Sequence, residues 1–197
     1  MNEIKLSVDE RLALAEAAGV VFPHMTNTSN PIDFPKGSAL SERPGDLIKL
    51  AQQGEFDVIV QGCNCFNTMG SGIAKQIREQ LPAAYDIDQT TEAGDINKLG
   101  NYTTADIQSG DTEFTVVNAY TQYDFNKNGD KTDRFEYASF EVILRKLEIR
   151  AGSCRFGFPL IGMGLAGGDK ARIMKLLEAF AIRVNAQGGQ VTLVEFA

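Results

Sequence analysis

The pattern of apolar and polar positions predicts strands that alternate with helices through most of the chain. A short apolar run at 58–60 is followed by a polar, glycine-rich loop at 66–72. Apolar residues then recur at 73, 77 and 81, which is the spacing of a helix. A strand at 156–161, a glycine loop at 162–168 and a helix at 170–185 repeat the same order. This alternation indicates an α/β protein with a layered sheet and helices on both faces.

The remaining periodic segments fit the same architecture. We expect a short helical turn at 47–50, a second helix or helical loop at 83–91, strands at 102–107, 114–120 and 191–196, a polar loop at 124–133 and a helix at 134–150. Both glycine loops follow a strand and precede a helix. We therefore expect them to meet at one edge of the sheet, outside the carboxyl ends of the strands, where such folds bind ligands.

The first glycine loop has the chemistry of an anion site. Gly70 and Gly72 carry no Cβ, so a ligand can approach the backbone closely. The helix that begins near Ser71 would point its free N–H groups at the same space, and these groups attract phosphate. An ordinary strand-to-helix turn that needs glycines is the alternative, because short glycine motifs are frequent by chance.

Length and composition limit the possible functions. The 197 residues suggest one domain with some length left over. We assign residues 1–40 to an N-terminal extension and 41–197 to the main domain. The net charge of −7 argues against broad nucleic-acid binding, but not against one nucleotide held by backbone N–H groups. No apolar run has the length of a membrane span, so we expect no membrane partner. Three cysteines and no signal-peptide pattern predict a cytoplasmic protein.

Four motifs, in order, resemble those of the macrodomain family, the ADP-ribose-binding module. They are Gly45-Asp-Leu47, Gly62-Cys-Asn-Cys65 with Met69-Gly-Ser-Gly-Ile-Ala74, Asn118-Ala-Tyr-Thr-Gln122, and Pro159-Leu-Ile-Gly-Met-Gly-Leu-Ala-Gly-Gly-Asp169. The resemblance covers about residues 44–197. It implies a three-layer α/β/α fold with a mixed central sheet, and ADP-ribose or a derivative as ligand.

The resemblance also implies site residues. Asp46 would accept a hydrogen bond from the adenine amino group, Asn64 would bind the distal ribose, and Tyr120 would border that ribose. The two loops would each hold one phosphate. The implied ligand-binding residues are Asp46, Leu47, Gly70, Ser71, Gly72, Ile73, Tyr120, Thr121, Gly162, Met163, Gly164, Leu165 and Ala166. A turn or helix-capping role for Asp46, a loop-capping role for Asn64 and a core position for Tyr120 are the alternatives.

The resemblance implies a hydrolase that acts at the 1'' position of ADP-ribose, with Asp169 and Asn64 as catalytic residues. The carboxylate of Asp169 would activate water, and a cap of the following helix is the alternative role. Gln61 stands where the family often has His, and 118–122 lacks the Lys that related glycohydrolases use as nucleophile. These departures favour direct hydrolysis, as in an ADP-ribose 1''-phosphate phosphatase. A hydrolase that removes ADP-ribose from protein or nucleic acid, and a module that only binds, stay open.

We expect no cofactor and no metal site. The single histidine, His24, lies in the extension, which argues against a catalytic triad. Cys63 and Cys65 are interpreted as small core residues rather than zinc ligands. Residues 124–129 match the first half of a calcium-binding loop, but Phe135 stands where the closing Glu should be.

Overall fold

The computed structural model describes residues 39–125, 130 and 132–196. The extension predicted at 1–40 therefore lies outside the described residues except for its last two positions. Most of the 124–129 segment lies outside them as well.

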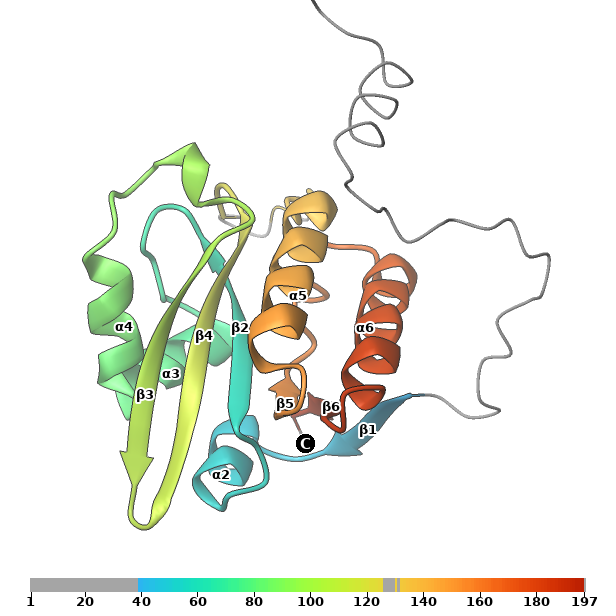
Figure 1. Cartoon of the computed structure of the whole chain (residues 1–197). Coiled ribbons are helices and arrows are strands. Elements are labelled where there is room, and N and C mark those ends of the chain that lie inside the picture. Colours follow the sequence, from blue (N-terminus) through green and yellow to red (C-terminus); the bar gives the residue numbers. More distant parts are fainter. Residues whose placement is uncertain (1–38, 126–129, 131, 197) are drawn as a thin grey trace, which may run out of the picture. The chain divides into compact units, whose positions relative to one another are not determined.

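The centre of the described domain is a mixed six-stranded sheet (Figure 1). Its strand order is β1-β6-β5-β2-β4-β3, and every neighbouring pair is parallel except β3 and β4. The strands are β1 (Leu40–Pro44), β2 (Val58–Asn64), β3 (Tyr102–Ser109), β4 (Thr112–Gln122), β5 (Arg155–Phe158) and β6 (Gln190–Glu195). The carboxyl ends of the five parallel strands consequently lie along one edge.

Helices cover both faces of the sheet, which makes the predicted three layers. One face packs against α5 (Tyr137–Ala151) and α6 (Lys170–Asn185), with Phe140, Phe158 and Phe180 among its fully buried side chains. The other face packs against α2 (Leu47–Gln52), α3 (Gly72–Gln80) and α4 (Pro82–Gln89). The 3-10 helix η1 (Ile96–Lys98) precedes β3. In Figure 1, α5 and α6 lie together, apart from α3 and α4. The three layers and the mixed sheet are those that the resemblance to macrodomains implies.

Several boundaries differ from those predicted from sequence. β2 continues to Asn64 rather than stopping at 60, and the Nε2 of its polar Gln61 donates inside the sheet to Asn118 Oδ1 at 2.7 Å. β5 ends at Phe158 rather than 161, since Pro159 has no N–H for the ladder. α5 begins at Tyr137 rather than 134. The edge strand β1 was not predicted, because four of its five side chains are exposed and give no apolar run.

No helix in the described part of the chain is long and apolar enough to span a membrane.

Candidate functional site at the carboxyl edge of the sheet

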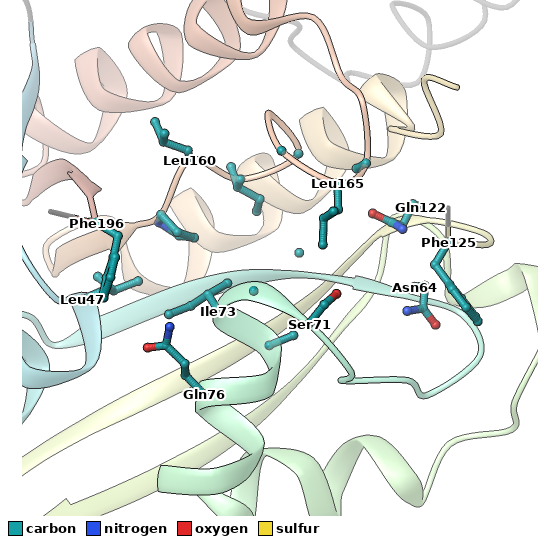
Figure 2. Close-up of a pocket in the computed structure, with 18 of the residues that line it drawn as sticks. Leu47, Asn64, Ser71, Ile73, Gln76, Gln122, Phe125, Leu160, Leu165 and Phe196 are labelled. Atoms are coloured by element: carbon teal, nitrogen blue, oxygen red, sulfur yellow. The ribbon is translucent and has the colours of Figure 1, made fainter. Parts of the chain in front are cut away.

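A pocket of about 730 Å³ runs along the edge at which the parallel strands end (Figure 2). This volume is within the range of small-molecule sites. Each of the five parallel strands contributes its last residue or the loop that follows it. The residues that line the pocket are Gly45, Leu47, Gly62, Asn64, Thr68, Gly70, Ser71, Gly72, Ile73, Ala74, Gln76, Gln122, Phe125, Pro159, Leu160, Ile161, Gly162, Gly164, Leu165, Ala166, Val194, Glu195 and Phe196.

The first glycine loop presents the start of α3 to the pocket. Ser71 is the N-cap residue, and its side chain makes no capping hydrogen bond. The N–H groups of the first turn therefore have no partner from within the helix or from the cap. A Cβ built on Gly70 or Gly72 would meet no atom within 4 Å, so the space in front of this backbone is open. An anion placed there would meet N–H groups and the positive end of the helix dipole.

The second glycine loop lines the same pocket from the other side. In Figure 2, Leu165 of this loop and Ser71 of the first loop lie on opposite sides of the pocket. The second loop closes on itself, because Gly168 N–H donates to the Gly162 carbonyl at 2.9 Å. A Cβ on Gly164 would also meet no atom within 4 Å. The two loops are thus brought together, and the space between them is open.

The segment before α5 supports the second loop from behind. The Phe135 ring is buried and fills the space that Gly162 leaves, since a Cβ there would lie 2.3 Å from the ring. The Arg134 N–H donates to the Ala166 carbonyl at 2.9 Å. The Tyr137 hydroxyl accepts the Asp169 N–H at 2.7 Å and donates to Asp133 Oδ2 at 2.5 Å. Burial, together with this hydrogen bond to Asp133, raises the pKa of the Tyr137 hydroxyl.

Asn64 lines one end of the pocket, and its amide holds its own loop. Nδ2 donates to the Thr68 carbonyl at 3.0 Å and to Thr68 Oγ1 at 2.7 Å. Oδ1 accepts the Phe66 N–H at 2.9 Å. Asn64 therefore has the loop-capping role that was the alternative, and it also lies in the pocket wall.

Asp46 and Leu47 lie at the opposite end. Leu47 lines the pocket. Asp46 is the N-cap residue of α2, and its Oδ1 accepts the N–H groups of Ile48 at 3.1 Å and Lys49 at 3.2 Å. Asp46 is not among the pocket-lining residues, although Gly45 and Leu47 on either side of it are.

The structure places Tyr120 in the core rather than beside the cleft. Its side chain is 2% exposed, packs with Cys63, Cys65 and Met69, and donates a hydrogen bond to Asp88 at 2.8 Å. Burial raises the pKa values of Tyr120, Asp88 and Cys63. The expectation that Tyr120 borders the cleft was wrong, because its alternating position on β4 directs it toward α4. The interpretation of both cysteines as core residues is confirmed.

Thr121, Met163 and Asp169 are also absent from the pocket lining. Thr121 is buried, and its Oγ1 has no hydrogen-bond partner among the described residues. Met163 packs partly buried against the core beneath α5 and α6. Asp169 caps α6, with its Oδ1 accepting the Arg172 N–H at 2.7 Å. Its helix-capping alternative is thus observed, and its catalytic role stays a prediction.

The structure adds residues that the sequence did not single out. Phe196 is 67% exposed and lies near Leu47 at one end of the pocket, whereas Gln122 and Phe125 lie near Asn64 at the other (Figure 2). Strand position is the signal that could have found them, because Gln122 ends β4 and Phe196 follows β6. Their residue types alone mark no chemistry.

The chemistry of the lining is mostly that of backbone and apolar groups. Of the described residues that line the pocket, Glu195 alone has an ionisable side chain. No group of three or more potential metal-binding side chains occurs among the residues that the structure describes. The pocket can therefore hold an anion through backbone N–H groups rather than through lysine or arginine.

No model of a known protein family matches the sequence. The chain is 30% identical over 146 residues to an uncharacterised 17.5 kDa protein of Enterobacteria phage T4, and the match covers 72% of this chain and 89% of the phage protein.

Solved structures of macrodomains share this fold. The macrodomain of Mycobacterium tuberculosis DarG superimposes with a TM-score of 0.58 at 18% identity, covering 81% of this chain and 98% of that one. Thermosipho africanus DarTG, solved in complex with ADP-ribose, matches with a TM-score of 0.61 at 15% identity, over 80% of this chain and 41% of that one. A Trypanosoma brucei macrodomain in complex with ADP matches with a TM-score of 0.58 at 11% identity, over 83% and 67%. The chain therefore has the macrodomain fold, with the four motifs that resemble those of the family in order along it.

Proposed function

We propose that the protein binds an ADP-ribose derivative in this pocket, with the diphosphate between the two glycine loops. The observation that carries the proposal is the placement of 70–74 and 162–166 on facing sides of one open pocket. Backbone N–H groups and a helix N-terminus favour a phosphate group. The nucleoside would lie toward Leu47 and Phe196, and the distal ribose toward Asn64 and Gln122.

The proposed reaction is hydrolysis of the 1'' substituent, with ADP-ribose 1''-phosphate as the substrate. Water supplies the attacking oxygen, and ADP-ribose and inorganic phosphate are the products. Asp169 is the proposed general base, since it is the carboxylate that follows the second loop. Asn64 would hold the distal ribose next to the substituent that leaves.

Phosphate release tests this reaction directly. The protein is incubated with ADP-ribose 1''-phosphate, and free phosphate is measured against a heat-denatured control. We expect release that is proportional to protein concentration and that is inhibited by ADP-ribose. Absence of release above the control would reject the phosphatase.

A binding module without turnover is the second candidate. Two observations favour it: Asp169 is not among the pocket-lining residues, and the Asn64 amide already bonds its own loop. Calorimetry with ADP-ribose measures binding, and mass spectrometry of ADP-ribose 1''-phosphate after incubation with the protein separates the two candidates. A binding module would bind ADP-ribose but would release neither phosphate from ADP-ribose 1''-phosphate nor ADP-ribose from modified carboxylate side chains or modified DNA bases. Release of ADP-ribose from the modified carboxylate side chains or the modified DNA bases would identify a hydrolase that removes ADP-ribose from a macromolecule.

A further inference from the structure

A buried lysine lies behind the first glycine loop. Lys98 is the last residue of η1 and is 7% exposed. Its ammonium group donates to Thr91 Oγ1 at 2.6 Å, to the Cys65 carbonyl at 3.2 Å, and to Asn67 Oδ1. It also lies 4.4 Å from the centre of the Tyr120 ring. An ammonium group has three donors, so these acceptors satisfy it and offset the cost of its burial.

Asn67, one of these acceptors, has an unusual backbone conformation. Its φ is 58°, and it is the single non-glycine residue with a positive φ in the described part of the chain. Asn tolerates this left-handed region better than most residues, yet the conformation still needs support. Its Nδ2 donates to the Asp88 carbonyl at 2.9 Å and the Thr91 carbonyl at 2.8 Å. Because Lys98 also donates to Asn67 Oδ1, both polar atoms of the Asn67 side chain have hydrogen-bond partners.

The turn at Asn67 determines where the next residue lies. Thr68 follows it directly and lines the pocket together with Asn64. The two are joined, since Asn64 Nδ2 donates to both oxygen atoms of Thr68. A change in the Asn67 conformation would therefore move Thr68 and release the Asn64 amide.

The part of the loop that forms the phosphate cradle is anchored separately. Met69 is 2% exposed and packs against Cys63 and Tyr120, between Thr68 and the glycines that precede α3. Gly70 to Ala74 make no contact with Lys98 in the described hydrogen bonds. Loss of the Lys98 contacts should consequently disturb the end of the pocket at Asn64 and leave the cradle in place.

We infer that Lys98 is a positioning residue that makes the pocket select ADP-ribose over ligands without a distal ribose. It acts through Asn67 on the Asn64–Thr68 wall and does not itself line the pocket. This inference rests on the proposed function, which assigns the distal ribose to that end.

The test compares two ligands on matched variants. Lys98→Met keeps an unbranched side chain that is one atom shorter, and it removes the ammonium group. Lys146→Met is the control, because Lys146 also bonds a backbone carbonyl and an Asn, Gly100 O at 2.8 Å and Asn101 Oδ1 at 2.6 Å, but no residue of the first loop. Dissociation constants for ADP-ribose and ADP are measured by calorimetry at a temperature at which all variants are folded.

We expect Lys98→Met to weaken ADP-ribose binding at least tenfold and ADP binding less than twofold, and Lys146→Met to change neither by more than twofold. Equal weakening of both ligands by Lys98→Met, or no weakening, would overturn the inference while leaving the proposed function intact. A wild-type protein that binds neither ligand would instead reject the proposed function. Should Lys98→Met fail to fold, Thr91→Val removes one acceptor of the ammonium group. It should weaken ADP-ribose binding about threefold relative to ADP, and equal effects on the two ligands would again overturn the inference.

Discussion

At the scale of single residues, the pocket depends on glycines, which have no side chain to fill it. A Cβ on Gly70, Gly72 or Gly164 would project into open space rather than into a neighbour. The space beside these three glycines is open in the free protein, so a ligand can approach their backbone closely.

Gly164 offers the sharpest test of this point, because its backbone φ is not in the left-handed region. We predict that Gly164→Val leaves the melting temperature within about 2 °C, since the new side chain meets no protein atom. It should nonetheless weaken ADP-ribose binding at least tenfold by occupying the ligand space.

Ala83→Val, at an exposed position of α4, is the control for introducing a valine away from the pocket. Thermal unfolding and calorimetry measure both effects. Unchanged affinity in Gly164→Val would mean that no ligand passes close to the second loop.

Asp169 combines an observed structural role with a predicted catalytic one, and substitution can separate them. Asn caps helices about as well as Asp, so Asp169→Asn should change the free energy of unfolding by less than about 0.5 kcal/mol. Asp169→Ala removes the cap and should cost about 1 kcal/mol.

If Asp169 is the general base, Asp169→Asn should lower the rate of phosphate release by about 100-fold or more, with little change in ADP-ribose affinity. Unfolding in denaturant and the phosphate assay measure the two effects. A wild-type rate in Asp169→Asn would leave Asp169 with the cap as its sole role.

At the scale of elements, the second loop depends on the segment that precedes α5. Gly162 has a φ of 72°, and its missing Cβ makes room for the Phe135 ring. We predict that Gly162→Ala destabilises the protein by about 3 kcal/mol, from the left-handed backbone and the clash together.

Gly110→Ala is a matched control, because its φ is 60° but a Cβ there meets no atom within 4 Å. It should cost about 1 kcal/mol. Chemical denaturation of both variants gives the difference. Equal losses of unfolding free energy in Gly162→Ala and Gly110→Ala would show that Phe135 moves aside and does not support the second loop.

Elements with a strong apolar period were predictable from sequence, and those without one were not. The helix at 170–185 has the predicted bounds because Ile173, Leu177 and Phe180 are all buried on one face. The β2 strand was predicted too short, since its polar Gln61 is held inside the sheet by a hydrogen bond to Asn118. Such pairing depends on a neighbour 57 residues away and leaves no local signal.

The site was predictable to the level of loops but not of every side chain. The edge of the sheet and the two glycine loops follow from the order of strands and helices. Tyr120 could not be placed, because the face that a strand residue adopts depends on the register between β2 and β4. Phe196 and Gln122 reach the pocket only through the topology of the sheet.

At the scale of the whole domain, an ion pair joins the residue that precedes β2 to the first residue of β5, at the edge of the sheet away from the pocket. Arg155 Nη2 lies 2.5 Å from Asp57 Oδ1, and the Arg155 N–H donates to Asp57 Oδ2 at 2.8 Å. These contacts with Arg155 hold the pKa of the Asp57 carboxyl below its usual value. Both side chains are more than a third exposed, so solvent screening keeps the contribution of the pair small.

We predict that Asp57→Asn lowers the free energy of unfolding by about 1 kcal/mol or less at pH 7. Because the pKa in the folded state is depressed, the contribution of Asp57 is complete above the unfolded-state pKa of about 4. It disappears as the pH falls through the lower folded-state pKa, so the two proteins should converge in strong acid. Asp111→Asn, at the β3–β4 turn, controls for net charge, and urea unfolding between pH 2 and 7 is the measurement. A difference in unfolding free energy between wild type and Asp57→Asn that grows toward low pH would contradict a stabilising Asp57–Arg155 pair.

A crystal structure of the protein grown with ADP-ribose would test the placement of the diphosphate most directly. We predict that its two phosphates lie between the N–H groups of 70–74 and those of 162–166, with the adenine toward Phe196 and the distal ribose toward Asn64. Density for the nucleotide outside this pocket, or a pocket left empty at saturating ligand, would contradict it.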